Sequence, residues 1–279
     1  MDNKEQELKD SAPPKDVSET LLSEGKSRDI TVRDDQFEFS FFLDTVRRFR
    51  DRKHRFRLID TGRFSSIELE WLAAAGADLY TSDDARSNAQ ELELINASSK
   101  KGNALVAFFF NGDLGVGEQG KSISLSELMN LGRSGVYVHV SNKKAKRDLS
   151  VLTQLADNCR KGGSWLVYYH HGALEMQVVG LAQNGAWIHI SDLSLADIES
   201  PSLAKDIVQS ACSSGGNLVL HWEKGVPFFL LNDIVKAGAV VLFESVLFDF
   251  KSPFRVFKEK AGGRKLDHRA YYLYPNVLP

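Results

Sequence analysis

The sequence predicts an α/β fold of the (β/α)8 TIM-barrel type, and two observations predict it. Four segments run from a glycine straight into an apolar strand that closes on small or acidic polar residues; they span 76–83, 135–142, 185–192 and 238–245. Four further apolar segments alternate with these, and each ends at a glycine; they span 56–62, 105–112, 166–172 and 218–225. A repeated supersecondary unit sets the architecture before single residues are interpreted. Eight strands in a fourfold internal repeat favour closure into a barrel.

Helical patterns separate these strands, at 67–75, 88–98, 125–132, 149–160, 202–212 and 229–237. Near-continuous apolar strands that alternate with amphipathic helices are typical of a parallel sheet covered by helices. An open doubly wound α/β sheet is the alternative. A leucine-rich horseshoe is disfavoured because no asparagine ladder recurs.

The first 35 residues are rich in charged residues, serine and proline and have no aromatic residue. Such a segment buries too little apolar surface to offset its ordering entropy, so residues 1–35 are predicted to be a disordered tail. Residues 36–279 then form a single barrel domain. Its first helix carries Phe39, Phe42, Val46 and Phe49 at helical spacing. We expect this helix to cover the bottom of the barrel and to keep its arginines in water.

Composition indicates which kinds of partner and which cellular compartment to expect. The net charge of −2 gives no electrostatic reason to expect a nucleic-acid partner. The sequence has no apolar signal region and no stretch near the roughly 18 apolar residues that a membrane helix needs, so no membrane partner is expected. The two cysteines, Cys159 and Cys212, are interpreted as reduced helix residues. These features favour a soluble, cytoplasmic protein that binds a small molecule, and they leave its oligomeric state open.

One segment matches the G-x-x-x-x-G-K-[ST] pattern of a phosphate-binding P-loop; its key residues are Gly115, Gly117, Gly120, Lys121 and Ser122. In a true P-loop, backbone N–H groups cradle the phosphates, the lysine reaches the terminal oxygens and the serine binds magnesium. The spacing of the repeat marks this segment as an insertion of about nine residues. The preceding strand also does not lead directly into the first glycine. We therefore expect a glycine-rich loop over the barrel mouth that binds an anion, with a P-loop NTPase as an alternative.

Histidines gather at the carboxyl ends of the predicted strands, where barrel enzymes place their chemistry. Side-chain alternation predicts that His139 and His189 point into the barrel, as do Asp60, Phe110, His170 and Glu223 on the other strands. For these other strands the opposite alternation, with Phe109 and Tyr169 inside, stays open. Imidazoles with a carboxylate suit zinc or manganese, and the candidate ligands are His139, His189, His221 and Glu244. Candidate acids and bases are Glu223, Asp60 and His170.

These features predict a barrel enzyme, a hydrolase or an isomerase, that acts on a small polar molecule. It either depends on a divalent metal or uses the same groups, without metal, as acid and base pairs. The main alternative is a non-catalytic barrel used as a binding or scaffold module. Short connections after the strands favour this alternative, because they leave few walls for a substrate pocket. The sequence does not name the substrate.

Overall fold

The computed structural model describes residues 30–112, 114, 123–143, 146–195, 200–222 and 228–243. Its strands are β1 Ile30–Arg33, β2 Phe56–Ile59, β3 Ala77–Ser82, β4 Val106–Phe110, β5 Tyr137–Ser141, β6 Leu166–His170, β7 Trp187–Ser191, β8 Asn217–Trp222 and β9 Val240–Phe243. Its helices are α2 Phe39–Asp51, α3 Ser66–Ala75, α4 Ala89–Lys101, α5 Leu125–Ser134, α6 Leu149–Lys161, α7 Gln177–Gln183, the 3-10 helix η1 Asp192–Leu195, α8 Ser200–Ser214 and α9 Phe228–Ala237.

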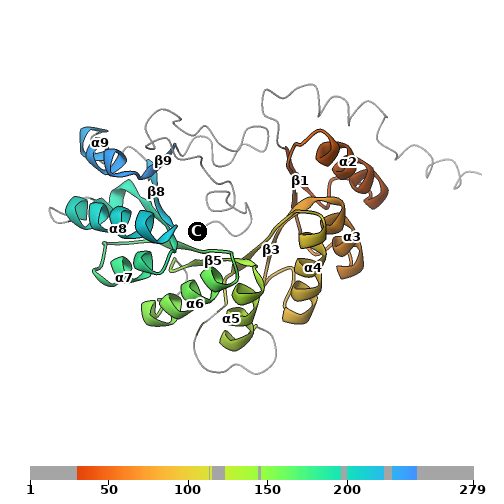
Figure 1. Cartoon of the computed structure of the whole chain (residues 1–279), viewed down its shortest axis with the longest axis horizontal. Coiled ribbons are helices and arrows are strands. Elements are labelled where there is room, and N and C mark those ends of the chain that lie inside the picture. The colour runs from red at the N-terminus through yellow and green to blue at the C-terminus, as the bar shows by residue number, and fades with distance from the viewer. Residues whose placement is uncertain are drawn as a thin grey trace, which may run out of the picture.

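The strands pair in chain order from β1 to β9, and every pair is parallel. The helices lie on the convex, outer side of the curved sheet (Figure 1). The prediction of an α/β barrel-type fold with alternating strands and helices is therefore confirmed. A doubly wound sheet reverses its strand order at a switch point, so the sequential order is against the open doubly wound alternative. Within the described residues β1 pairs only with β2 and β9 only with β8, and the sheet forms an open arc.

Strand β1 lies inside the segment that was predicted to be a tail. It pairs with β2 in the register Ile30↔Phe56 and Val32↔Leu58. Its central residues, Thr31 and Val32, are buried. Ordered structure therefore begins before the predicted boundary at residue 35, and the sheet gains a strand beyond the eight expected. Four residues between charged neighbours are too few to show a strand pattern.

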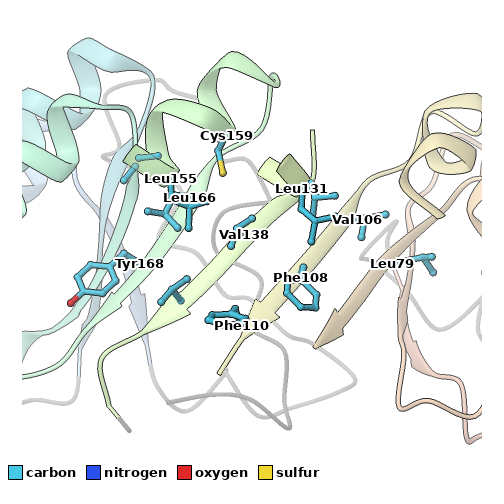
Figure 2. Packing of buried hydrophobic residues seen from close by; sticks show 14 of the residues in the cluster. Leu79, Val106, Phe108, Phe110, Leu131, Val138, Leu155, Cys159, Leu166 and Tyr168 are labelled. Carbon is cyan, nitrogen blue, oxygen red and sulfur yellow. The ribbon is translucent and has the colours of Figure 1, made fainter. Parts of the chain in front are cut away.

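The two faces of the sheet bury different side chains. The convex face packs beneath the helices through a continuous apolar cluster that includes Leu79, Phe108, Val138 and Leu166 (Figure 2). The concave face carries a second cluster rich in aromatic residues, namely Ile59, Tyr80, Leu105, Ala107, Phe109, Tyr137, Val167, Tyr169, Trp187, Val219 and Val240. The prediction that Phe110 points into the barrel is wrong, because its ring packs beside Phe108 on the helix side (Figure 2).

Successive helix ends approach one another very closely. Three glycines make this possible: an added Cβ atom would lie 2.1 Å from Ala73 O at Gly102, 2.3 Å from Gly132 O at Gly162 and 2.1 Å from Ala186 O at Gly216. Real Cβ atoms do not approach a carbonyl oxygen at such distances. Any larger residue therefore separates the helix-to-strand connections of neighbouring units.

Replacing Gly162 by alanine should destabilise the fold by about 2–3 kcal/mol, because the methyl group collides with backbone oxygens that cannot move away. Gly162 ends α6 in an ordinary right-handed conformation, so the cost is steric. Gly180→Ala is the matched control: Gly180 lies inside α7, and its Cβ meets no atom within 4 Å. This control should stabilise the helix by about 0.5–1 kcal/mol. Urea unfolding measures both, and equal effects would contradict the close-approach argument.

Candidate functional site

A row of five aromatic rings crosses the concave face from β4 to β8. In order it contains Phe109, His139, Tyr169, His189 and His221, and neighbouring ring centroids are 4.1, 5.9, 4.6 and 5.1 Å apart. The strand register sets this row, because Phe109 stands opposite His139 and Tyr169 opposite His189. His139 and His189 thus lie on the concave side, as side-chain alternation predicts. We call this set the ring row.

Two hydrogen bonds connect members of the ring row. His139 Nδ1 lies 2.9 Å from the Tyr169 hydroxyl, and His189 Nδ1 lies 2.8 Å from His221 Nε2. Burial raises the pKa of Tyr169 well above its ordinary value, so the phenol stays protonated and can donate a hydrogen bond to His139 Nδ1. Burial, and then the charge of His171, lowers the pKa of His221 to about 4. His221 is therefore neutral near pH 7.

The ring row meets solvent at its His221 end. His139 and His189 are each 1% exposed, whereas His221 is only partly buried. Next to this end lies the exposed His171, which follows β6. The row therefore opens at the carboxyl edge of the sheet, where barrel enzymes place their chemistry.

The predicted metal ligands do not converge. Tyr169 on β6 separates His139 from His189, and the Nδ1 atoms of both histidines engage other side chains of the row. The part of the chain that the structure describes contains no group of three or more His, Cys, Asp or Glu side chains that could hold a metal ion. Glu244 lies outside the described residues. The donors that are described therefore do not fit a zinc or manganese site, which needs at least three convergent ligands.

Asp60 is fully buried in an ion pair. Arg86 donates from Nε to Asp60 Oδ2 at 2.9 Å and from Nη2 to Oδ1 at 3.0 Å. The Thr81 hydroxyl and the Gly62 N–H also donate to this carboxylate. Its oxygens are thus occupied by local donors, which points to a structural role for this predicted catalytic residue. Sequence reasoning missed Arg86, because nothing in the chain marks a partner 26 residues away.

His170 lies on the helix side of the sheet, so its predicted inward orientation is wrong. Its Nε2 atom lies 2.9 Å from the carbonyl oxygen of Ala173, and its Nδ1 atom lies 3.5 Å from the Tyr168 hydroxyl. A carbonyl oxygen only accepts, so Nε2 is the donor of this hydrogen bond. Tyr168 packs in the convex cluster (Figure 2), which separates His170 from the ring row. Glu223, the third predicted acid or base, lies outside the described residues.

A ladder of Asp and Asn side chains runs along the carboxyl edge at every second strand. Asp34 Oδ2 accepts from Thr61 N at 3.1 Å, Asp83 Oδ2 from Asn111 N at 2.9 Å, and Asn142 Oδ1 from His171 N at 2.7 Å. Each residue follows one strand and holds the loop after the next strand. Burial raises the pKa of Asp34 and of Asp83. The signal of this ladder in the sequence is the polar residue that follows alternate strands, such as Asp83 and Asn142.

A cavity of about 600 Å³ opens at the same edge; it is lined by Lys146, Arg147, Asp148, Leu149, Ser150, Glu175 and Gln177. Arg147 is buried and donates to the carbonyl oxygens of Ser141, Asn111 and Gly112, which fixes the loop before α6. The predicted anion-binding loop, from Gly115 to Ser122, lies outside the described residues.

Comparisons with known proteins do not assign the chain to a family. No protein-family model matches it, and no curated protein sequence is significantly similar to it. Among solved structures, a deoxyribose phosphate aldolase from Aeropyrum pernix is 12% identical with a TM-score of 0.32, over 75% of this chain and 84% of that one. A phospho-2-dehydro-3-deoxyheptonate aldolase from Thermotoga maritima is 11% identical with a TM-score of 0.32, over 74% of this chain and 66% of that one. Likenesses at this level carry no argument about the activity of this chain.

Among the described residues no helix has both the length and the hydropathy that a membrane span requires.

Replacing Arg86 by alanine should destabilise the fold by about 3–5 kcal/mol, because it leaves the buried Asp60 carboxylate without its cation. Arg160→Ala is the control: its ion pair with Asp157 is exposed and should be worth less than about 1 kcal/mol. Chemical unfolding near pH 7 measures both. An Arg86→Ala loss as small as that of the control would show that Asp60 does not depend on this ion pair.

Proposed function

We propose that the chain is an enzyme that uses acid–base catalysis on a small polar molecule, with His221 as the base and His189 as the residue that positions it. The observation that carries this proposal is the 2.8 Å contact between His189 Nδ1 and His221 Nε2 at the carboxyl edge of the sheet. A histidine that is held by a second group and reaches solvent is the usual arrangement of a general base.

The two members of the pair have different roles in this proposal. His221 is the partly exposed member, and its lowered pKa keeps it unprotonated at neutral pH, so it can accept a proton from a substrate. Its Nε2 atom engages His189, which leaves Nδ1 as the atom that exchanges the proton. The buried His189 orients the His221 ring and is a positioning residue. Hydrolysis and isomerisation both use such a base, and the proposal covers either reaction.

A binding or scaffold module is the second candidate, and the burial of the ring row favours it. His139 and His189 are 1% exposed, and Phe109 and Tyr169 are 4% exposed. Four of the five rings therefore fill the interior and cannot touch a substrate directly. Under this alternative the hydrogen bonds of the row only satisfy its buried polar atoms.

Turnover of a mixture of small polar metabolites, followed by proton NMR, distinguishes the two candidates. The enzyme proposal expects at least one compound to be converted, and it expects His221→Gln to lower the rate by about 10²–10⁴-fold. The control is His170→Gln, because His170 lies on the helix side and should retain conversion. A complete absence of turnover, or full activity in His221→Gln, would sink the enzyme proposal and leave the binding module.

His221 should also make the stability of the protein depend on pH. Its pKa is 6.5 in the unfolded chain and about 4 in the folded protein. Between these values the unfolded chain binds a proton that the folded protein excludes, so stability is full above about pH 6.5 and is lost as the pH falls toward 4. The free energy of unfolding should therefore fall less steeply across this window in His221→Gln than in the unchanged protein. Identical slopes would contradict the lowered pKa.

A further inference from the structure

The amino edge of the sheet, where helices end and strands begin, carries a dense set of basic side chains. Because all the strands are parallel, every helix-to-strand connection reaches this same edge. The last turns of α2, α4, α5 and α6 and the connection that follows α2 supply the set, which we call the basic edge: Arg48, Arg50, Arg52, Lys53, Arg55, Lys100, Lys101, Arg133, Arg160 and Lys161. All are exposed except Arg55, whose side chain is still 41% exposed.

Few carboxylates oppose this charge. Asp51, Asp78 and Asp157 pair with members of the basic edge. In the described structure these three carboxylates pair with Arg50, Arg55, Arg160 and Lys161, so the ten basic side chains outnumber the carboxylates that form ion pairs with them, in a chain whose net charge is −2. The opposite edge has the reverse bias at its helix starts, where the first turns of α3, α4 and α5 carry Glu68, Glu91 and Glu127.

Helix dipoles account for part of the basic edge. The carboxyl end of a helix is equivalent to about half a negative charge, and one basic residue in the last turn offsets it. The connection after α2 goes beyond this need, because it places Arg52, Lys53 and Arg55 next to Arg48 and Arg50 at a single helix end. This accumulation of positive charge at one helix end attracts anions more strongly than a single residue that offsets the dipole would.

The residue types indicate which anion fits. Six of the ten are arginines, whose planar guanidinium group binds phosphate oxygens through two parallel hydrogen bonds. The exposed large hydrophobic residues of the described chain are Ile67, Trp71, Leu94, Met176 and Leu193, and none of them lies on the basic edge. Among the described residues the basic edge therefore offers no exposed large apolar side chain to insert into a lipid surface, and Trp165, just before β6, is only partly exposed.

We propose that the basic edge binds the phosphate backbone of a nucleic-acid duplex without reading its sequence. Its charges are spread from α2 to α6 along the curved sheet (Figure 1), which suits a long polyanion better than a single phosphate group. This partner differs from the expectation drawn from the net charge of −2, because that total averages over two edges of opposite bias. The proposal is independent of the acid–base site, which lies at the other edge.

Fluorescence anisotropy of a labelled duplex of about 30 base pairs, titrated with the full chain at about 50–200 mM salt, tests the proposal. The variant Lys100→Gln/Lys101→Gln removes two charges from the basic edge, and Lys143→Gln/Lys146→Gln is the matched control at the opposite edge, where both lysines are also exposed. Affinity should fall steeply with salt. The first variant should reduce the slope of log K against log salt by about two, and the control should leave it unchanged.

Three outcomes would overturn the proposal. One is no salt-dependent binding of the duplex by the unchanged protein. Another is an equal change of slope in the two lysine pairs, which would place the contact elsewhere on the chain. The third is binding to phosphatidylserine vesicles without binding to the duplex, which would assign the edge to a membrane surface. Thermal unfolding of both variants verifies that they fold, as their exposed positions predict.

Discussion

Parallel strands can pair in chain order only if each helix carries the chain back to the edge where the preceding strand began. This return places the helices in a single layer on the convex face and brings consecutive helix ends into contact. Gly102, Gly162 and Gly216 stand where that contact is tightest, each against carbonyl oxygens of the preceding helix end. The same constraint gives the molecule two unlike edges. Each described α-helix begins near the carboxyl edge and ends near the amino edge. Charged residues, loops and the polar residues at strand ends are therefore distributed differently between the two edges.

The alternation of apolar strands with helices was sufficient to predict the fold class, but it could not predict which side chains face the helices. In β4 the residues Phe108, Phe109 and Phe110 are consecutive and all buried. When both faces of a strand are buried, the period of two disappears from the sequence. The alternation was predicted correctly for His139 and His189, because in those strands aliphatic and polar residues alternate. Strand β1 escaped prediction for a different reason, since it takes its stability from pairing with β2 and not from its own composition.

For the candidate site, the sequence could predict on which strands the residues lie, but it could not predict which side chains they contact. The sequence placed histidines on neighbouring strands at one edge, and the ring row contains three of them. It could not show that Tyr169 lies between His139 and His189, or that His189 Nδ1 and His221 Nε2 form a hydrogen bond. Both contacts depend on the register of strands that are distant in the chain. The pairing of Asp60 with Arg86 has the same origin. Asp60 follows β2, Arg86 lies between β3 and α4, and the pairing of β2 with β3 brings the two residues together.

The net charge of the sequence does not show how the fold distributes charged residues over the surface. A total of −2 describes a chain in solution, whereas a partner meets one edge at a time. Parallel order places the last turns of α2, α4, α5 and α6 along the amino edge, so basic residues that each offset a helix dipole add to one basic edge, although the last turn of α3 carries none. The carboxyl edge receives the helix starts, the Asp and Asn ladder and the exposed end of the ring row. The acid–base chemistry proposed for one edge and the duplex binding proposed for the other therefore depend on different residues, and a variant that removes one should leave the other intact.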